Sequence, residues 1–194
     1  MKCNILHIGC HNGNDGIYSF VSKNIENIGS VVLVDANPIC IENAKKQYDG
    51  ISNCTFECFA VLPVSIDGKS IDLHSPVGEE MSTVSSVIKD FVTTHSKDLN
   101  TDTFKAKTTT LKELLLKYPE TNYLSVDTEG LDVLNLFSLD PKDYDNIKKV
   151  VFEFIHSDGT VSFGGSKLQS LLYYFGQLGF KKCYQEEFNI HCEK

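Results

Sequence analysis

Residues 4–16 read NILHIGCHNGNDG, an apolar run followed by a turn that is rich in glycine. The run predicts a strand from Asn4 to Ile8, and three glycines follow it with the spacing G-x-x-x-G-x-x-G (Gly9, Gly13 and Gly16). Apolar residues then recur at helical intervals as far as Gly29 (Ile17, Phe20, Val21, Ile25 and Ile28). A strand, a glycine turn and a helix in this order form the unit with which doubly wound α/β folds bind nucleotides.

Strand-length apolar runs and helical segments continue to alternate along the chain. Further strands are predicted over residues 31–34, 54–61, 122–126 and 149–155. Helices are predicted to begin at Asn37-Pro38, at the capping box Thr110-Leu111-Lys112-Glu113 and at Thr128, with a last helix over residues 168–178. This alternation predicts a single α/β domain over residues 1–194, with a Rossmann-like, doubly wound, mostly parallel sheet and helices on both faces.

Three segments fit this pattern less closely. Residues 66–69 (IDGK) predict the turn of a short hairpin, and residues 180–192 predict one or two edge strands. Residues 74–103 show no strong period, and a long irregular segment in a compact domain is often functional. We therefore expect residues 74–103 to form a lid or a substrate loop.

The composition limits the possible partners. The formal net charge is -8, and all 18 basic residues are lysines, so no guanidinium is present to grip phosphates in a bidentate way. A nucleic-acid partner is therefore not expected, although the lack of arginine fits the codon usage of an AT-rich genome equally well.

The longest aliphatic run (residues 31–34) is too short to cross a membrane, and the N-terminus does not have the zones of a signal peptide, which predicts a cytoplasmic protein. Seven cysteines without any C-x-x-C pair predict reduced thiols in a core.

An acidic loop follows the second predicted strand. Asp35 ends this strand and lies 22 residues after Gly13, close to the spacing of about 20 at which an acid meets ribose hydroxyls in such folds. Asp35 could instead be a helix-capping or solvated carboxylate. Asp15 lies at the predicted start of the first helix, where it would compete with a pyrophosphate. A ligand that carries a ribose but few phosphates fits both acids best.

These motifs resemble those of the FkbM-type methyltransferases, which use S-adenosylmethionine and mostly methylate hydroxyl groups. The resemblance covers most of the chain in order: HIGCHNG, VLVDANP, FAV, TTTLKELL, YLSVDTEGLDVL and VVFEF. It implies that Gly9 and Gly13 shape the cofactor turn and that Asp35 holds the ribose. It also implies that Phe59 and Ala60 lie along the adenine and that Asp127 and Glu129 face the reacting centre. The remaining residues of the expected cofactor site are His7, His11, Ala36 and Asn37.

The chain departs from many methyltransferases at the end of the first strand. They carry an acid there, near the amino group of the methionine moiety, whereas this chain has His7. A neutral imidazole could accept one hydrogen bond, but weaker cofactor binding or a degenerate enzyme becomes possible. His7, Cys10 and His11 could alternatively ligate a metal, which their placement around a tight turn disfavours.

Acidic residues gather at the predicted ends of two neighbouring strands. Ligands bind outside the carboxyl ends of strands in open α/β sheets, so we expect a catalytic edge there, formed by Asp127, Glu129, Glu153 and His156. Glu129 could instead be a helix first-turn acid that the helix dipole favours, as could Asp132. Asp127 is the first candidate for a general base or an acceptor-orienting group, with Glu153 and His156 behind it. The sequence does not indicate a metal site, although Asp127, Glu129 or Glu153 could hold a divalent cation that lowers the hydroxyl pKa.

The sequence therefore predicts an S-adenosylmethionine-dependent O-methyltransferase whose partner is a small-molecule or sugar hydroxyl acceptor. Neither a membrane nor a nucleic acid is expected as a partner. Two alternatives remain open: a non-catalytic binding module with the same fold, for which His7 is the main support, and an NAD-binding oxidoreductase domain. The glycine spacing and Asp15 disfavour the oxidoreductase.

Overall fold

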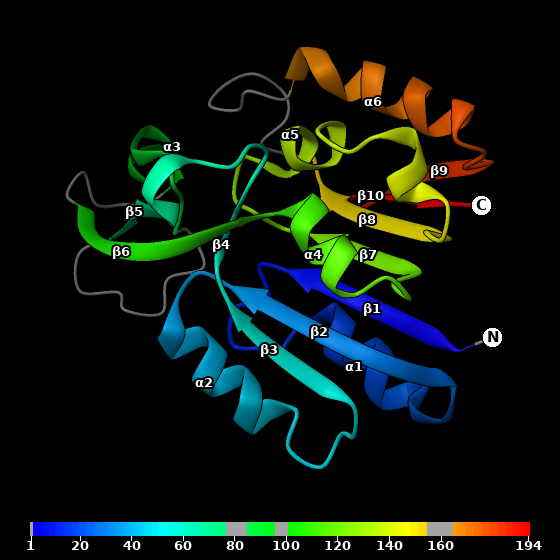
Figure 1. Ribbon diagram of the computed structural model, residues 1–194, viewed down its shortest axis with the longest axis horizontal. Coiled ribbons are helices and arrows are strands. Elements are labelled where there is room, and N and C mark those ends of the chain that lie inside the picture. Colours follow the sequence, from blue (N-terminus) through cyan, green and yellow to red (C-terminus); the bar gives the residue numbers. More distant parts are fainter. Residues whose placement is uncertain (1, 77–84, 96–100, 155–164) are drawn as a thin grey trace.

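The main sheet has seven strands. A computed structural model describes residues 2–76, 85–95, 101–154 and 165–194. The strand order is β3-β2-β1-β7-β8-β10-β9, which can be followed in Figure 1. The strands in this order are β3 (Cys54–Cys58), β2 (Ile28–Asp35), β1 (Cys3–Ile8), β7 (Tyr123–Val126), β8 (Lys149–Glu153), β10 (Asn189–Glu193) and β9 (Lys182–Glu186). The first five are parallel to one another, and β10 is antiparallel to both of its neighbours, so the predicted mostly parallel α/β sheet is confirmed.

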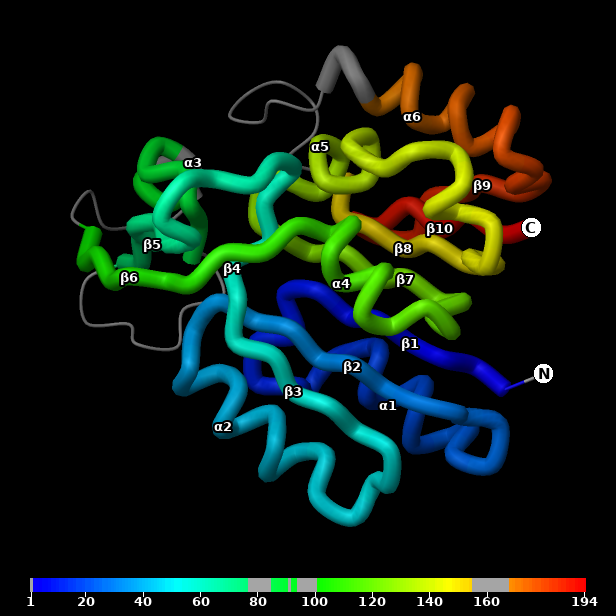
Figure 2. The backbone as a smooth tube through the Cα atoms, in the orientation of Figure 1, coloured from blue at the N-terminus to red at the C-terminus, as the bar shows by residue number. Residues whose placement is uncertain are grey.

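Helices cover both faces of the sheet, as the doubly wound pattern predicts. One face packs against α1 (Gly16–Lys23) and α2 (Pro38–Gln47) through a core that includes Ile5 and Leu33. The opposite face packs against α4 (Leu111–Lys117), α5 (Asp132–Phe137) and α6 (Gly165–Gln177) through a core that includes Leu6 and Leu124. Alternate residues of one strand thus enter opposite cores, because successive side chains point to opposite faces. Figure 2 shows the backbone path of the central strands between these helices.

The predicted third strand, residues 54–61, is broken. It ends as β3 at Cys58, and the chain resumes as β4 (Ala60–Leu62), which belongs to a separate sheet of order β4-β6-β5. The break lies at Phe59, whose N–H donates the last ladder bond to the Asp35 carbonyl at 2.9 Å. Beyond this point β2 offers no further partner, and β4 pairs in parallel with β6 (Thr101–Thr110) instead.

The predicted hairpin turn at residues 66–69 is wrong. These residues contain a short 3-10 helix, η2 (Asp67–Lys69), and lead into β5 (Ser70–Pro76). The strands before and after the turn do not pair with each other, because β6 lies between them and pairs with β5 in antiparallel fashion. A local turn signal could not reveal a strand that inserts from much further along the chain.

The predicted lid segment contains regular structure. Residues 74–103 include the end of β5, the helix α3 (Lys89–His95) and the start of β6, whereas residues 77–84 and 96–100 lie outside the described residues. His74 and Ser86 exchange two backbone hydrogen bonds, of 2.8 and 3.0 Å, which tie the two described parts together. The small sheet and α3 lie beyond the carboxyl ends of β1 and β2 (Figure 1). A lid role for this segment stays a prediction.

Several predicted boundaries shift. The first helix ends at Lys23, and a 3-10 turn, η1 (Ile25–Asn27), leads into β2 at Ile28. The strand predicted to reach residue 155 ends at Glu153. The predicted capping box at Thr110 is confirmed. The predicted tail forms two strands, of which only β9 lies at the edge of the sheet, because β10 pairs with both β8 and β9. A third 3-10 helix is η3 (Pro141–Tyr144).

The expectation of reduced thiols is wrong for one pair. Cys183 and Cys192 face each other across β9 and β10 and form a disulfide. The sequence did not predict this disulfide, because the pairing depends on the register of two strands. The other five cysteines are free (Cys3, Cys10, Cys40, Cys54 and Cys58).

Among the described residues, no helix is long and apolar enough to cross a membrane.

Candidate functional site

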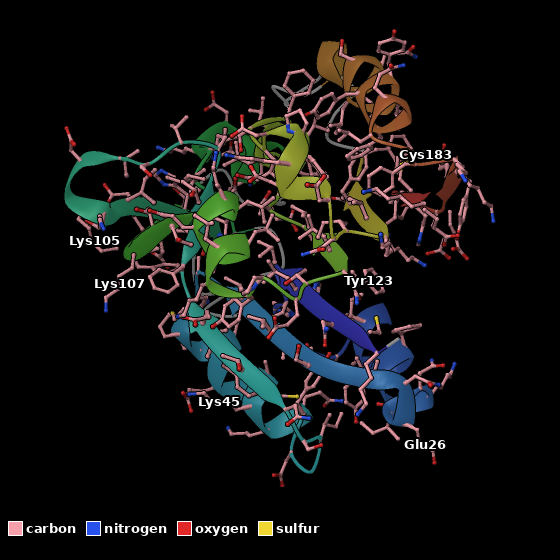
Figure 3. All side chains as sticks on the ribbon, turned by 45° about the vertical axis from the view of Figure 1, so that its right-hand side comes forward. Glu26, Lys45, Lys105, Lys107, Tyr123 and Cys183 are labelled. Carbon is pink, nitrogen blue, oxygen red and sulfur yellow. A yellow bond between two sulfur atoms is a disulfide. The ribbon has the colours of Figure 1, made fainter. Side chains whose placement is uncertain are left out.

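A cavity of about 490 Å³ opens at the carboxyl ends of the central strands. Its lining includes the acids Asp15, Asp35, Asp127 and Glu129, and no lysine among the described residues lines it. The lysines that Figure 3 labels are exposed on the outside of the molecule (Lys45, Lys105 and Lys107). The cavity is therefore rich in negative charge, which favours a ligand that carries positive charge.

The glycine turn forms the floor of the cavity and requires glycine at Gly9. Gly9 has a φ of 74°, and a Cβ atom there would lie 1.6 Å from the carbonyl oxygen of Asp127. The turn is fixed to β2, because the Gly9 and Cys10 amides both donate to the Val34 carbonyl, at 2.8 and 3.1 Å. Gly13 also has a positive φ, of 76°, and packs closely against α2. The turn thus brings the ends of β1, β2 and β7 together.

Asp35 joins the glycine turn to the loop before α2. Its Oδ2 accepts the His11 N–H and its Oδ1 accepts the Asn37 N–H, each at 2.8 Å. Burial raises the pKa of Asp35, whereas these two backbone hydrogen bonds lower it. The carboxylate is held at the cavity wall in one orientation.

The other expected cofactor residues surround Asp35. Ala36, Phe59 and Ala60 line the cavity beside it, as do His7, His11 and Asn37. Asn37 is buried, and its side chain caps α2 by accepting the Ile39 N–H at 2.9 Å. Asn37 therefore shapes the loop in which Asp35 lies.

His7 pairs with Asp15, for which the sequence predicted only competition with a pyrophosphate. His7 Nε2 lies 2.8 Å from Asp15 Oδ2. Asp15 is the N-cap of α1 and accepts the Tyr18 N–H at 2.9 Å. Burial raises the pKa of Asp15, but the His7 contact and the backbone hydrogen bonds outweigh it and leave the pKa below its ordinary value. The pair brings an ionised carboxylate to the end of β1, where His7 alone would bring none.

The alternative metal site at His7, Cys10 and His11 does not form. Cys10 is buried, and its thiol contacts the His11 carbonyl at 3.8 Å. Among the described residues, the only group of three side chains whose ligand atoms converge is Asp127, Glu129 and Glu153. His7 is engaged with Asp15 instead.

Asp127, Glu129 and Glu153 converge at the ends of β7 and β8, with one oxygen of each within 4.8 Å of the others. The Asp127 N–H donates to the Ile8 carbonyl at 3.0 Å, which continues the pairing of β1 with β7. Glu129 has a φ of 49° and Gly130 a φ of 101°, so the chain leaves the strand through a left-handed turn. This turn is also why the expected cap at Thr128 is wrong and α5 begins only at Asp132.

Burial and mutual repulsion disfavour ionisation in this group. Burial, and next the Asp127 charge, raise the pKa values of Glu129 and Asp132. The same two causes raise the pKa of Glu153 to about 7. Burial also raises the pKa of Asp127, although the nearby His7 ring lowers it. Several carboxyl groups with raised pKa values at one cavity are typical of functional sites.

Other residues of the site were not found from the sequence. Asp132 is only 2% exposed, and its carboxylate accepts the Thr128 N–H at 2.9 Å behind the cavity wall. From the segment after β5, Ser86 donates its hydroxyl hydrogen to the Glu129 carbonyl at 2.9 Å. From β10, His191 lines the cavity. Long-range pairing places these residues, so no local pattern signals them. The fourth predicted catalytic residue, His156, lies outside the described residues.

Comparison with protein-family models and with curated proteins gives no match. Among solved structures, the methyltransferase FkbM from Methylobacillus flagellatus KT is similar over 100% of this chain and 44% of its own, with a TM-score of 0.60 and 8% identity. The chain thus spans less than half the length of that protein.

Two further structures resemble the chain more weakly, each with a TM-score of 0.45 and 8% identity. They are a ribosomal protein L11 methylase from Lactobacillus delbrueckii subsp. bulgaricus (99% of this chain, 69% of that chain) and a putative methyltransferase from Pseudomonas syringae (98% and 86%). At 8% identity, the likeness to the FkbM structure establishes a shared fold, and the chemistry has to be argued from the site.

Proposed function

We propose that the chain binds S-adenosylmethionine in this cavity and transfers the methyl group to a hydroxyl oxygen of a small molecule or a sugar. The observation that carries the proposal is one continuous cavity with Asp35 at its β2 end and the acids Asp127 and Glu129 at its β7 end. The cavity lies at the point where the strand order reverses, between β1 and β7, where doubly wound sheets bind their ligands.

Asp35 suits the ribose of this ligand. Each of its oxygens accepts one backbone N–H, and a carboxylate oxygen has a further lone pair that can accept a ribose hydroxyl. Phe59 and Ala60 offer apolar surface beside it for the adenine ring. The backbone hydrogen bonds hold the carboxylate before the ligand arrives, which lowers the entropic cost of binding.

The charge of the cavity suits the other end of the ligand. S-adenosylmethionine carries a cationic sulfur and an ammonium group, and four acids line the cavity without any lysine among the described residues. The ionised Asp15 beside His7 would receive the ammonium group. A pyrophosphate would meet the same acids unfavourably, which argues against NAD.

Bound S-adenosylmethionine would supply an electrophilic methyl group. In the proposed step, the acceptor oxygen forms a bond to the methyl carbon, the bond between that carbon and sulfur breaks, and the Asp127 carboxylate takes the hydroxyl proton. The raised pKa of Asp127 makes it a stronger base than an exposed carboxylate. The remainder of the catalytic effect would come from the alignment of the acceptor with the carbon–sulfur bond.

Isothermal titration calorimetry tests the cofactor. We expect S-adenosylmethionine and S-adenosylhomocysteine to bind at one site per chain and NAD not to bind. Binding of NAD without binding of S-adenosylmethionine would support the oxidoreductase alternative and overturn the proposal. The non-catalytic alternative predicts that S-adenosylmethionine binds but that its methyl group is never transferred to any hydroxyl compound.

A further inference from the structure

Three carboxylates from two parts of the chain meet where β7 and β8 end, and two of them, Asp127 and Glu129, line the cavity. Asp127 follows β7, Glu129 lies in the left-handed turn after it, and Glu153 ends β8. One oxygen of each lies within 4.8 Å of the other two. Oxygen ligands lie about 2.0–2.1 Å from Mg²⁺ and about 2.3–2.6 Å from Ca²⁺, so ligands on opposite sides of one ion are about 4–5 Å apart. The three oxygens are therefore spaced as ligands of a single ion would be.

A separate observation concerns the hydrogen bonds of Asp127. Its Oδ1 atom is buried and has no hydrogen-bond partner among the described residues. An unpartnered polar atom in such a position is costly, and for a charged group the cost is larger. A cation bound between the three carboxylates would give this oxygen the partner that the described residues do not supply.

The described residues supply little positive charge at this point. His7 has the largest charge effect on Asp127, but its Nε2 atom is bonded to Asp15. Over the described ranges, lysines do not line the cavity, and the chain contains no arginine. Among the described residues, the carboxyl groups at this point therefore outnumber the basic side chains.

From these observations we infer that Asp127, Glu129 and Glu153 bind one divalent cation that prefers oxygen ligands, such as Mg²⁺ or Mn²⁺. Carboxylates are the ligands that such ions select, and three of them leave further coordination positions for water or for a substrate oxygen. Binding of the ion is independent of the proposed methyl transfer. Its role rests on that function: an acceptor hydroxyl that ligates the ion would have a lower pKa and lie near Asp127.

Binding of Mn²⁺ can be measured on the purified chain without any cofactor. The electron paramagnetic resonance signal of free Mn²⁺ disappears on binding, so a titration gives the stoichiometry and the dissociation constant. We expect one Mn²⁺ per chain, displaced by excess Mg²⁺. Glu129→Gln and Glu153→Gln should each weaken binding at least tenfold, because each replaces a charged ligand by a neutral amide of the same size.

A matched control is Glu26→Gln, which changes an exposed acid at the edge of the molecule (Figure 3). It should leave Mn²⁺ binding unchanged. The thermal melting curve of each variant, recorded in the same buffer, shows that it is folded. The inference is wrong if the wild type does not bind Mn²⁺, or if folded Glu129→Gln and Glu153→Gln bind it as tightly as Glu26→Gln does.

The same preparations separate this inference from the proposed function. Calorimetry with S-adenosylmethionine in the presence of a chelator tests the cofactor alone. Mn²⁺ binding without cofactor binding would overturn the proposed function and support the cation site. Cofactor binding without Mn²⁺ binding would support the proposed function and overturn the cation site.

Discussion

His7 and Asp15 lie opposite each other across the glycine turn, with 2.8 Å between Nε2 and Oδ2. An ionised carboxylate can only accept, so Nε2 carries the hydrogen and donates it to Asp15. Asp15 also caps α1, which fixes its carboxylate from a second side. Asp15 therefore brings a carboxylate to the cavity beside the end of β1, where the strand itself carries His7.

This arrangement predicts the effect of Asp15→Asn. Asparagine is also a good N-cap, so the helix and the melting temperature should change little. The charge is lost, and we expect the dissociation constants of S-adenosylmethionine and S-adenosylhomocysteine to rise by about tenfold, because both ligands carry the same ammonium group. Calorimetry measures both constants. Equal affinities in the variant and the wild type would show that Asp15 does not receive the ligand.

The buried acid Asp132 predicts a dependence of stability on pH. Its pKa is raised in the folded state by burial and next by the Asp127 charge. Between the pKa of the unfolded chain, about 4, and the higher folded pKa, the folded state binds more protons than the unfolded state. Its contribution to stability is therefore present at low pH and is lost as the pH rises through the folded pKa.

Asp132→Asn should remove this contribution to the pH dependence. The amide oxygen of the introduced side chain would still accept the Thr128 N–H, as a protonated carboxyl does. We expect the variant to melt at least about 2 °C above the wild type at pH 8, in a buffer with a chelator, and to lose most of this advantage at pH 5. A variant that is less stable than the wild type at pH 8 would mean that the ionised carboxylate stabilises the fold.

The strands β1, β2, β7 and β8 could be predicted because each contains a short apolar run bounded by a turn. The glycine turn and Asp35 could also be predicted, because the signal for both is a spacing of residues along the sequence. The break at Phe59 could not be predicted, because it depends on where the partner strand β2 ends. The insertion of β6 between β4 and β5 likewise depends on pairing between distant segments.

The acids of the site were predicted from their positions after two strands, but their grouping needs the register of those strands. Val126 pairs with Phe152, and this register brings the residues that follow to one edge. The contact of His7 with Asp15 could not be predicted, because the sequence does not show how the turn between them folds back. Asp132 was interpreted as a helix first-turn acid, and its burial follows from the packing of α5 on the sheet.

If Asp127 takes the acceptor proton, Asp127→Asn should affect the rate and not the binding of the cofactor. The change keeps size and polarity, so S-adenosylmethionine affinity should stay within a few-fold of the wild-type value. The single-turnover rate should fall by at least about 100-fold with an acceptor found by screening hydroxyl compounds. A folded variant that turns over at a near-normal rate would shift the role of base to Glu153.

Asp35 is proposed to hold the ribose of S-adenosylmethionine, and one calorimetric titration tests this role most directly. S-adenosylmethionine is titrated into the wild type, into Asp35→Ala and into the control Asp49→Ala, which changes an exposed acid just after α2. Loss of charge-assisted hydrogen bonds should weaken binding to Asp35→Ala by about 1.5–3 kcal/mol, or about 10- to 150-fold, and leave the control unchanged. Melting curves show whether Asp35→Ala is folded at the temperature of the titration. Wild-type affinity in folded Asp35→Ala, or no binding of S-adenosylmethionine to the wild type, would contradict the account.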